Sequence, residues 1–377
     1  MWYHWIGDSR HLDVSVIESA EILLARLKKE TTDKRILKAT FFIDIRNRKS
    51  YDWWTKRLNK LTERIFEDPL LVTVIPQSPI DAELYLEAWY LNHSEDRVHV
   101  EKFENGQMMN ISCRENRYQL LVVSAYSLSG NTIKDAESCF QQIQKTIDDW
   151  HYPLNQMFRH WNYIGNILEI SDGRQNYQRF NEVRARYFSS TFFPDGYPAA
   201  TGIGMNFPGV IVEACFLTSG EYRQLGISNP MQLSAHQYSE KVLVSPGGGK
   251  STPKFERAKA IVNHEGSTIF VSGTAAVIGE DTSSSDSPEE QTVQTLQIIQ
   301  RLIERENLER YINLDKRTEF FYKYVRIYIK NGYISDHIKE QVEHAFPDTP
   351  SVYLTADICR DRLLVEIEVE IKINCVP

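Results

Sequence analysis

Three glutamates at alternate positions near the end of the chain have a spacing that could serve chemistry. Glu366, Glu368 and Glu370 lie in the run VEIEVEI of residues 365–371, where acidic and apolar residues alternate. A period of two is typical of a strand, so all three carboxyl groups lie on one face. A carboxyl group on a buried face can donate or accept a proton, whereas the plain alternative is a sheet face open to water.

The same pattern occurs twice earlier in the chain. Residues 84–91 (LYLEAWYL) and 210–217 (VIVEACFL) also alternate around a glutamate, and we align their Glu87 and Glu213 with Glu366. Each copy follows a strand, an amphipathic helix and a loop with proline. Such internal repetition decides the topology of a fold. The three predicted units are residues 1–105, which form an incomplete copy, residues 106–222 and residues 223–377.

Composition and charge exclude several classes of protein. The 377 residues are 42% hydrophobic with a formal net charge of −8, and the chain has no run of about 18 apolar residues that could span a membrane. Its start lacks the basic flank and apolar core of a signal peptide, so we expect a cytoplasmic protein. The acidic balance argues against nucleic acid as a partner, because that binding needs a clustered basic face.

Other apparent motifs favour no function. Residues 245–252 (SPGGGKST) resemble a phosphate-binding loop, but Val244 stands where that motif needs glycine. The five cysteines are scattered without a CxxC pair, and the ten histidines form no HExxH pair. We therefore predict neither a disulfide framework nor a metal site, and no cofactor.

The elements that must position the glutamates alternate between helices and strands, which indicates an α+β protein. Apolar residues at helical spacing predict a helix over residues 14–30 and another over residues 51–66. In the last unit, Ser287 is a good N-cap, with Pro288 at the first helical position.

Seven blocks in roughly the last 220 residues carry a resemblance to a known family. They are HWNYIGNI (160–167), NYQRFNEVRARYF (176–188), YPAATGIGM (197–205), NPMQLSAHQY (229–238), PKFERAKAI (253–261), SGTAAVIG (272–279) and ADICRDRLLVEIE (356–368). In this order they resemble the FkbO/Hyg5-like chorismatases, within the RidA/YjgF-like superfamily, whose small subunits form trimers. The resemblance implies three RidA/YjgF-like (chorismate mutase-like) units joined in a single-chain pseudo-trimer, and therefore a monomer.

The resemblance also implies an activity and its residues. It implies hydrolysis of the enolpyruvyl ether of chorismate to pyruvate and either 3-hydroxybenzoate or a dihydroxycyclohexadiene carboxylate. The enolpyruvyl methylene must be protonated, which needs a carboxylic acid that stays protonated near neutral pH. Glu366 matches the family's glutamate and is the candidate general acid, and Cys359 matches the branch that makes 3-hydroxybenzoate. The implied substrate-binding residues are Arg257, Tyr238, Gln232, Thr201 and Arg360.

Each of these roles has a plain alternative. Glu366 could be a solvated strand residue, Cys359 a small buried hydrophobe and Arg360 an ordinary turn residue. The chain also departs from the family, because residues 280–291 form a different loop and residues 242–252 look inserted. A different enolpyruvyl acid could therefore be the substrate.

Two further function classes stay open. A RidA-like imine deaminase needs an arginine after the proline that precedes the closing strand, where this chain has Ser351 and Ala199. A non-catalytic protein that binds a small metabolite is the other class, because folds of this kind host unrelated functions.

Overall fold

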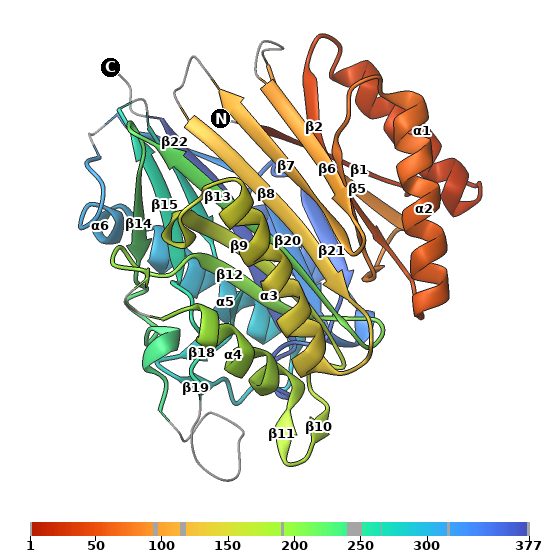
Figure 1. Cartoon of the computed structure of the whole chain (residues 1–377). Coiled ribbons are helices and arrows are strands. Elements are labelled where there is room, and N and C mark those ends of the chain that lie inside the picture. Colours follow the sequence, from red (N-terminus) through yellow and green to blue (C-terminus); the bar gives the residue numbers. More distant parts are fainter. Residues whose placement is uncertain are drawn as a thin grey trace.

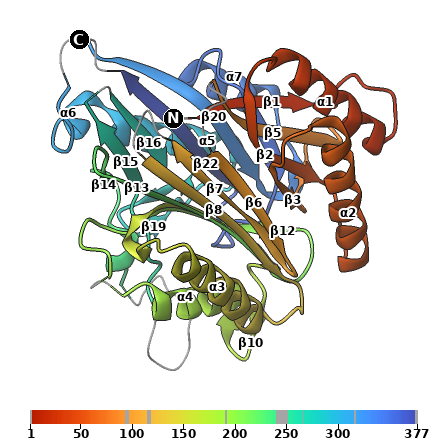
Figure 2. The ribbon, with the colours of Figure 1, turned by 45° about the horizontal axis from the view of Figure 1, so that its top comes forward.

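Three large β-sheets with helices on their outer sides, and two small sheets of two strands each (β10 with β11, β18 with β19), form the described part of the computed structural model of the chain (Figure 1). In the view of Figure 2, α1 and α2 lie at the right, and α3 and α4 lie at the bottom. The structure describes residues 2–92, 97–113, 118–189, 192–239, 251–264, 266–314 and 317–374.

The first sheet has four strands in the order β1-β5-β2-β3, covered by α1 and α2. Strand β5, which carries Glu87, is antiparallel to β2, and β2 is parallel to β3. The elements are β1 (Tyr3–Asp8), α1 (Val16–Glu30), β2 (Arg35–Ile43), α2 (Arg48–Ile65), β3 (Leu71–Ile75), β4 (Ser78–Pro79) and β5 (Leu84–Leu91).

The second sheet has six strands in the order β12-β9-β13-β8-β7-β6, and α3 packs on it and against α4. Because β6 pairs with β7, this sheet begins at Arg97, before the boundary predicted at residue 106. The elements are β6 (Arg97–Phe103), β7 (Gly106–Cys113), β8 (Tyr118–Ser127), α3 (Thr132–Asp149), η1 (Leu154–Gln156), β9 (Met157–Gly165), β10 (Ile170–Ser171), β11 (Arg174–Gln175), α4 (Asn176–Tyr187), β12 (Ala199–Met205) and β13 (Val210–Ser219).

The third sheet runs β14-β15-β16-β22-β20-β21-β4, with β17 also paired to β22. Its last strand, β4, comes from the first unit, so this sheet joins the first unit to the third. The elements are β14 (Arg223–Ile227), η3 (Ala235–Gln237), β15 (Ala258–Asn263), β16 (Gly266–Val271), β17 (Thr274–Ala275), β18 (Val277–Ile278), β19 (Asp281–Thr282), α5 (Pro288–Ile303), α6 (Arg305–Leu308), β20 (Glu319–Ile329), η5 (Lys330–Gly332), α7 (Asp336–Ala345), β21 (Ser351–Thr355) and β22 (Val365–Asn374).

One arrangement recurs in all three sheets. A parallel pair of strands (β2 with β3, β9 with β12, β20 with β21) is joined by a glutamate-bearing strand that is antiparallel to the first member. Each of these antiparallel pairs contains one register shift, at corresponding places. The α+β class predicted from the sequence is confirmed, with three copies of this arrangement.

The register corrects the predicted alignment of the glutamates. Glu87 lies opposite Thr40, Glu213 opposite Trp161 and Glu368 opposite Arg326, each two residues beyond the register shift. The counterpart of Glu87 and Glu213 is therefore Glu368 and not Glu366. The sequence alignment was wrong because a shift of two residues along a strand keeps every side chain on the same face and leaves the alternation unchanged.

The true counterparts of Glu366 are not acidic. Two residues further from the register shift, Glu366 lies opposite Tyr328 in the third sheet. At the same position Tyr85 lies opposite Phe42 in the first sheet and Ile211 lies opposite Tyr163 in the second, so Tyr85 and Ile211 are the counterparts of Glu366. Only the third copy therefore carries a carboxyl group at this position.

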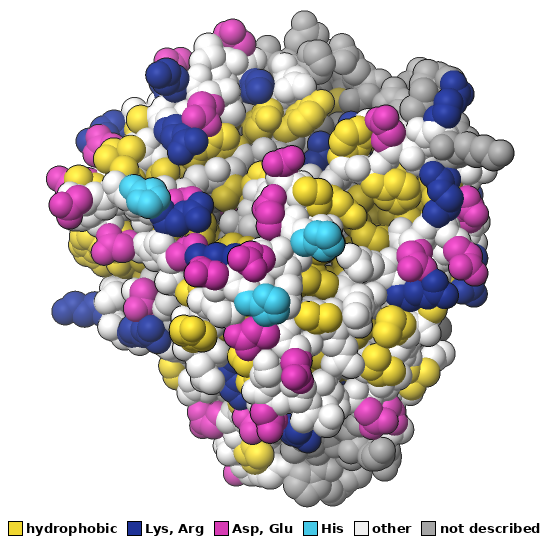
Figure 3. Space-filling model, turned by 180° about the vertical axis from the view of Figure 1, so that it is seen from behind, with side chains coloured by type: hydrophobic (Ala, Val, Ile, Leu, Met, Phe, Trp, Pro, Cys, Tyr) yellow, Lys and Arg dark blue, Asp and Glu magenta, His cyan; other side chains and the backbone are white. Residues whose placement is uncertain are grey.

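Charges of both signs cover the surface. On the face opposite to that of Figure 1, Lys and Arg side chains lie among Asp and Glu side chains (Figure 3). Within the described parts of the chain, none of the helices is both long and apolar enough to cross a lipid bilayer. The cytoplasmic location stays a prediction.

Candidate active site

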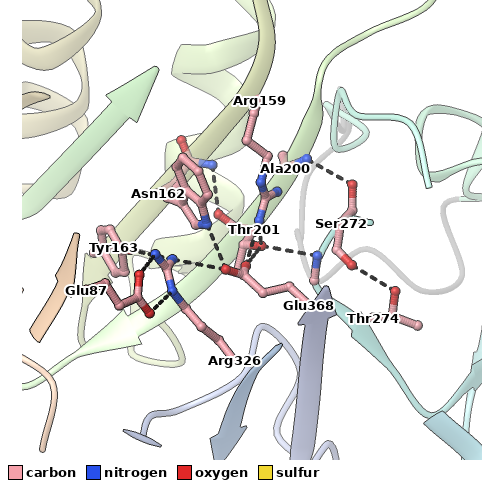
Figure 4. Close-up of polar contacts among 12 residues, drawn as sticks. Glu87, Arg159, Asn162, Tyr163, Ala200, Thr201, Ser272, Thr274, Arg326 and Glu368 are labelled. Carbon is pink, nitrogen blue, oxygen red and sulfur yellow. Dashed lines mark hydrogen bonds and ion pairs between the residues drawn. The ribbon is translucent and has the colours of Figure 1, made fainter. Parts of the chain in front are cut away.

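Buried ion pairs join the three sheets to one another (Figure 4). Lys38 of the first sheet pairs with Glu213 of the second. Arg159 of the second sheet pairs with Glu368 of the third, at 2.6 Å from Nη2 to Oε2. The third contact closes the ring, because Arg326 binds both carboxylate oxygens of Glu87 and lies 3.0 Å from Glu368 Oε1.

In these pairs three buried cations neutralise three buried carboxylates, and Glu366 is not one of them. Glu366 is only 4% exposed and forms no ion pair with any described residue. Burial, followed by the charge of Glu368, raises its pKa and Arg159 opposes both, so that the pKa moves from an ordinary 4.5 to about 8. The carboxyl group of Glu366 is therefore protonated at neutral pH.

A turn of the third unit leaves room for this carboxyl group. A Cβ atom at Gly273 would overlap Glu366 Oε1, so the turn needs glycine here. The Gly273 amide donates to the carbonyl oxygen of Ala200 and to Oγ1 of Thr201, each at 3.1 Å, while Ser272 Oγ accepts from the Ala200 amide. These bonds dock the turn onto the edge of β12 (Figure 4).

Glu366 lines a cavity of about 380 Å³ between the second and third units. This volume suits a small ligand. Six of the predicted site residues line it: Glu366, Cys359, Arg257, Tyr238, Gln232 and Arg360.

Thr201 is the predicted site residue that does not line this cavity. It is fully buried, and its hydroxyl group donates to Glu368 and accepts from Arg159 Nη2 at 2.7 Å. It therefore belongs to the ion-pair network behind Glu366.

Two arginines and one tyrosine form a positive corner of the cavity. Arg257 Nη2 donates to the Tyr238 hydroxyl at 2.7 Å, and the guanidinium groups of Arg257 and Arg360 lie 5.5 and 5.1 Å from the centre of the Tyr238 ring. Arg360 also donates to the carbonyl oxygen of Glu280 and to Oγ1 of Thr282. Neither arginine pairs with a carboxylate of the described residues, so both charges are open to an anionic ligand.

The Cys359 thiol is neutral. Burial, then the nearby Glu366, raise its pKa to about 12, while Arg360 opposes them. A protonated thiol is not a nucleophile, so Cys359 can act by shape and as a weak hydrogen-bond donor.

A larger cavity, of about 450 Å³, lies between α2 with β3 and β7 with β8. None of the predicted site residues lines it. Its charged side chains, on Asp52, Lys56, Lys60, Glu63 and Lys102, are all exposed. It therefore lacks a buried acid, and we assign the site to the smaller cavity.

Sequence analysis missed the ion-pair network and one wall of the cavity. The signal for the network was present, because Lys38, Arg159 and Arg326 lie in strands made largely of apolar and aromatic residues. Tyr177, which lines the cavity, lies within a block that resembles the family, but nothing in its spacing marked it. Most of the segment that looks inserted, residues 242–250, lies outside the described residues.

Comparisons with known proteins place this geometry in context. Residues 96–217 match the family model for the N-terminal part of the FkbO/Hyg5-like chorismatases, so the likeness begins earlier than the sequence blocks indicated. A 3-hydroxybenzoate synthase of Streptomyces hygroscopicus is 28% identical over 272 residues, which are 70% of this chain and 77% of that protein. A chorismatase of the same organism is 27% identical over 299 residues, covering 78% and 82%. The crystal structure of a chorismatase shares the fold, with a TM-score of 0.72, 21% identity and 98% of both chains covered.

Proposed function

This chain is a relative of the FkbO/Hyg5-like chorismatases, and we propose that it is an enzyme that cleaves the enolpyruvyl ether of chorismate. The observation that carries the proposal is Glu366, a buried carboxyl group that is protonated at neutral pH and has no cationic partner among the described residues. It lines the same cavity as two arginines that pair with no carboxylate of the described residues.

The first step is proton transfer to carbon. Glu366 donates its proton to the terminal methylene of the enolpyruvyl group, whose double-bond electrons form the new C–H bond. The ether carbon becomes an oxocarbenium-like centre. Addition of water there gives a hemiketal, which collapses to pyruvate and the ring alcohol, a dihydroxycyclohexadiene carboxylate, and the proton released from water returns to Glu366.

The cavity offers partners for a carboxylate and a hydroxyl group of such a substrate. Arg257 and Arg360 bind carboxylate, and Tyr238 orients them. Gln232 donates through Nε2 to the carbonyl oxygen of Val277 at 3.0 Å, and its buried Oε1 has no hydrogen-bond partner. That oxygen can accept a hydrogen bond from the ring hydroxyl group.

Within this activity, we assign the product as 3-hydroxybenzoate. The assignment rests on Cys359, which lines the cavity as a neutral thiol, and on the relative named 3-hydroxybenzoate synthase. Forming this product requires the ring to lose its second hydroxyl group and a ring hydrogen as water, and so to aromatise, before it leaves the cavity; the water lost offsets the water added in the cleavage.

The test is incubation of the purified protein with chorismate. We expect equimolar release of pyruvate and a ring acid, measured by a coupled pyruvate assay and by chromatography. If calorimetry detected binding of chorismate but no pyruvate formed, the protein would be a metabolite-binding protein and the proposal would fail.

A further inference from the structure

Arg184 of α4 is a buried cation without a carboxylate partner among the described residues. Its side chain is 1% exposed, and Nη2 donates to Asn181 Oδ1 at 2.7 Å. Its Nε is buried without a hydrogen-bond partner, and no acidic side chain in the described parts of the chain forms an ion pair with it. A guanidinium cannot release its proton, and an unpaired buried charge is unfavourable. The counter-charge must come from outside the described residues.

The groups around Arg184 add no negative charge. Burial, followed by the charge of Arg184, lowers the pKa of Lys254 and that of His160. His160 is therefore neutral, and its Nε2 is also buried without a hydrogen-bond partner. A positive potential thus lies behind this wall of the cavity.

Tyr177 connects Arg184 to the cavity. It lies seven residues before Arg184 on α4, two helical turns away on the same face, and its side chain lines the cavity. Burial and the nearby Cys359 raise the pKa of Tyr177, Arg184 lowers it, Glu366 raises it, and a hydrogen bond with Asn181 lowers it. The phenol therefore lies within electrostatic reach of both the cavity groups and the buried guanidinium. Gly202 leaves space for the ring, because a Cβ atom there would lie 3.0 Å from Tyr177 Cε2.

We propose that Tyr177 and Arg184 form a second carboxylate-binding arm, on the second-unit side of the cavity. The Tyr177 hydroxyl donates a hydrogen bond to one carboxylate of the ligand, and Arg184 is a positioning residue whose charge that carboxylate neutralises. Arg257 and Arg360, on the third-unit side, hold the other carboxylate. The site therefore prefers ring compounds with two carboxylates. That the ligand is chorismate rests on the proposed function, whereas the preference for two carboxylates does not depend on it.

The test compares a ring with two carboxylates and a ring with one. Calorimetry measures the binding of benzene-1,3-dicarboxylate and of benzoate to the wild type, to Tyr177→Phe and to the matched control Tyr187→Phe, which lies on the same helix away from the cavity. We expect Tyr177→Phe to weaken dicarboxylate binding about tenfold or more and benzoate binding less than twofold, because a hydrogen bond to a charged group is lost. Equal loss for both probes, or a wild type that does not prefer the dicarboxylate, would overturn the proposal.

Arg184 is tested by charge and by kinetics. Arg184→Lys keeps the positive charge and should retain the dicarboxylate preference, whereas Arg184→Met should lose it; melting curves check that both variants fold. With chorismate, Tyr177→Phe should raise KM about tenfold and leave kcat within about threefold. If Tyr177→Phe turned over chorismate with an unchanged KM, the carboxylate-binding arm would be refuted and the proposed function would stand. If the wild type released no pyruvate but still showed a dicarboxylate preference that depends on Tyr177, the arm would stand and the proposed function would fail.

Discussion

Glu366 and Glu368 lie two residues apart on the same face of β22, and only Glu368 is held by arginines. Burial alone would raise the pKa of Glu368, but Arg159 and Arg326 lower it, with hydrogen bonds from Thr201 and Trp161. Glu366 forms no ion pair with the described residues, and burial with the charge of Glu368 raises its pKa to about 8 against the opposing charge of Arg159. Two neighbouring carboxyl groups thus take opposite protonation states at neutral pH, and the charged one helps to keep the other neutral.

Glu366→Gln should abolish most turnover and spare binding. The amide keeps the shape of the side chain but cannot deliver a proton, and positioned acid catalysis contributes about 100- to 10,000-fold. We expect kcat for pyruvate release to fall by that factor, while calorimetry gives a Kd for chorismate close to the wild-type KM. Pyruvate release at a near-normal rate would assign the acid to another group.

The pH dependence should report the same carboxyl group. Since Glu366 must be protonated to act, kcat/KM should fall as the pH rises through about 8. The free energy of unfolding should also fall as the pH rises. The folded protein keeps this proton up to about pH 8, whereas the unfolded chain releases it near the ordinary pKa of 4.5. Wild-type stability relative to Glu366→Gln should therefore decrease between pH 4.5 and 8, as measured by urea unfolding at several pH values. A constant difference would contradict the raised pKa.

Gly273→Ala should inactivate the enzyme by displacing Glu366, and it should leave the residues that bind the substrate's carboxylates in place. The added Cβ overlaps Glu366 Oε1 and lies 3.1 Å from Thr201 Cγ2, so the acid must move. A displacement of about 1 Å from the productive geometry can reduce the rate about 100-fold, which a pyruvate assay would detect. Gly220→Ala is the control, because a Cβ atom there meets nothing within 4 Å. Equal activity of the two variants would refute the role of the Gly273 turn.

Cys359→Ala should change the product and not the first step. Removing the thiol leaves Glu366 in place, so pyruvate release should persist within about tenfold, a small effect beside the loss of a general acid. The ring product should shift from 3-hydroxybenzoate toward the dihydroxycyclohexadiene carboxylate, as chromatography would show. An unmutated protein that made only the dihydrodiol would disprove the assignment of Cys359 and leave the cleavage reaction standing.

The protein should be a monomer. Lys38 with Glu213, Arg159 with Glu368 and Arg326 with Glu87 close a ring of contacts among the three sheets. In the parts of the chain that the structure describes, each sheet already contacts both of the others in this way, so no such contact is left for another copy of the chain. Light scattering at micromolar concentration should give the 43.9 kDa mass of one chain, and a stable trimer would contradict this arrangement.

The sequence predicted the repeated arrangement and six of the residues that line the cavity, but not the start of the second sheet, the register or the charges. Motif resemblance located Glu366, Arg257 and Cys359, because short blocks keep their residues together along the chain. Alternation could not distinguish Glu366 from Glu368 as the counterpart of Glu213, since both lie on one face. The distinction depends on cations from other sheets, and such long-range pairs leave no local pattern.

Arg184 illustrates the same limit in another way. Within α4 its spacing resembles that of any buried helical residue, and the helix itself gives no reason to expect a functional role. Its lack of a counter-charge becomes visible only when every neighbouring element is in place. Unpaired buried groups are properties of the assembled fold, so a sequence pattern cannot reveal them.

The positions equivalent to Glu366 in the other two units hold Tyr85 and Ile211. This difference shows how the sequence of a fused chain can vary at equivalent positions. In a symmetric trimer one substitution appears in every cleft at once, so an unfavourable buried acid would be carried three times. Joining the units in one polypeptide lets each position vary alone. Here a single copy bears the destabilising carboxyl group, while an aromatic and an aliphatic side chain fill the equivalent places.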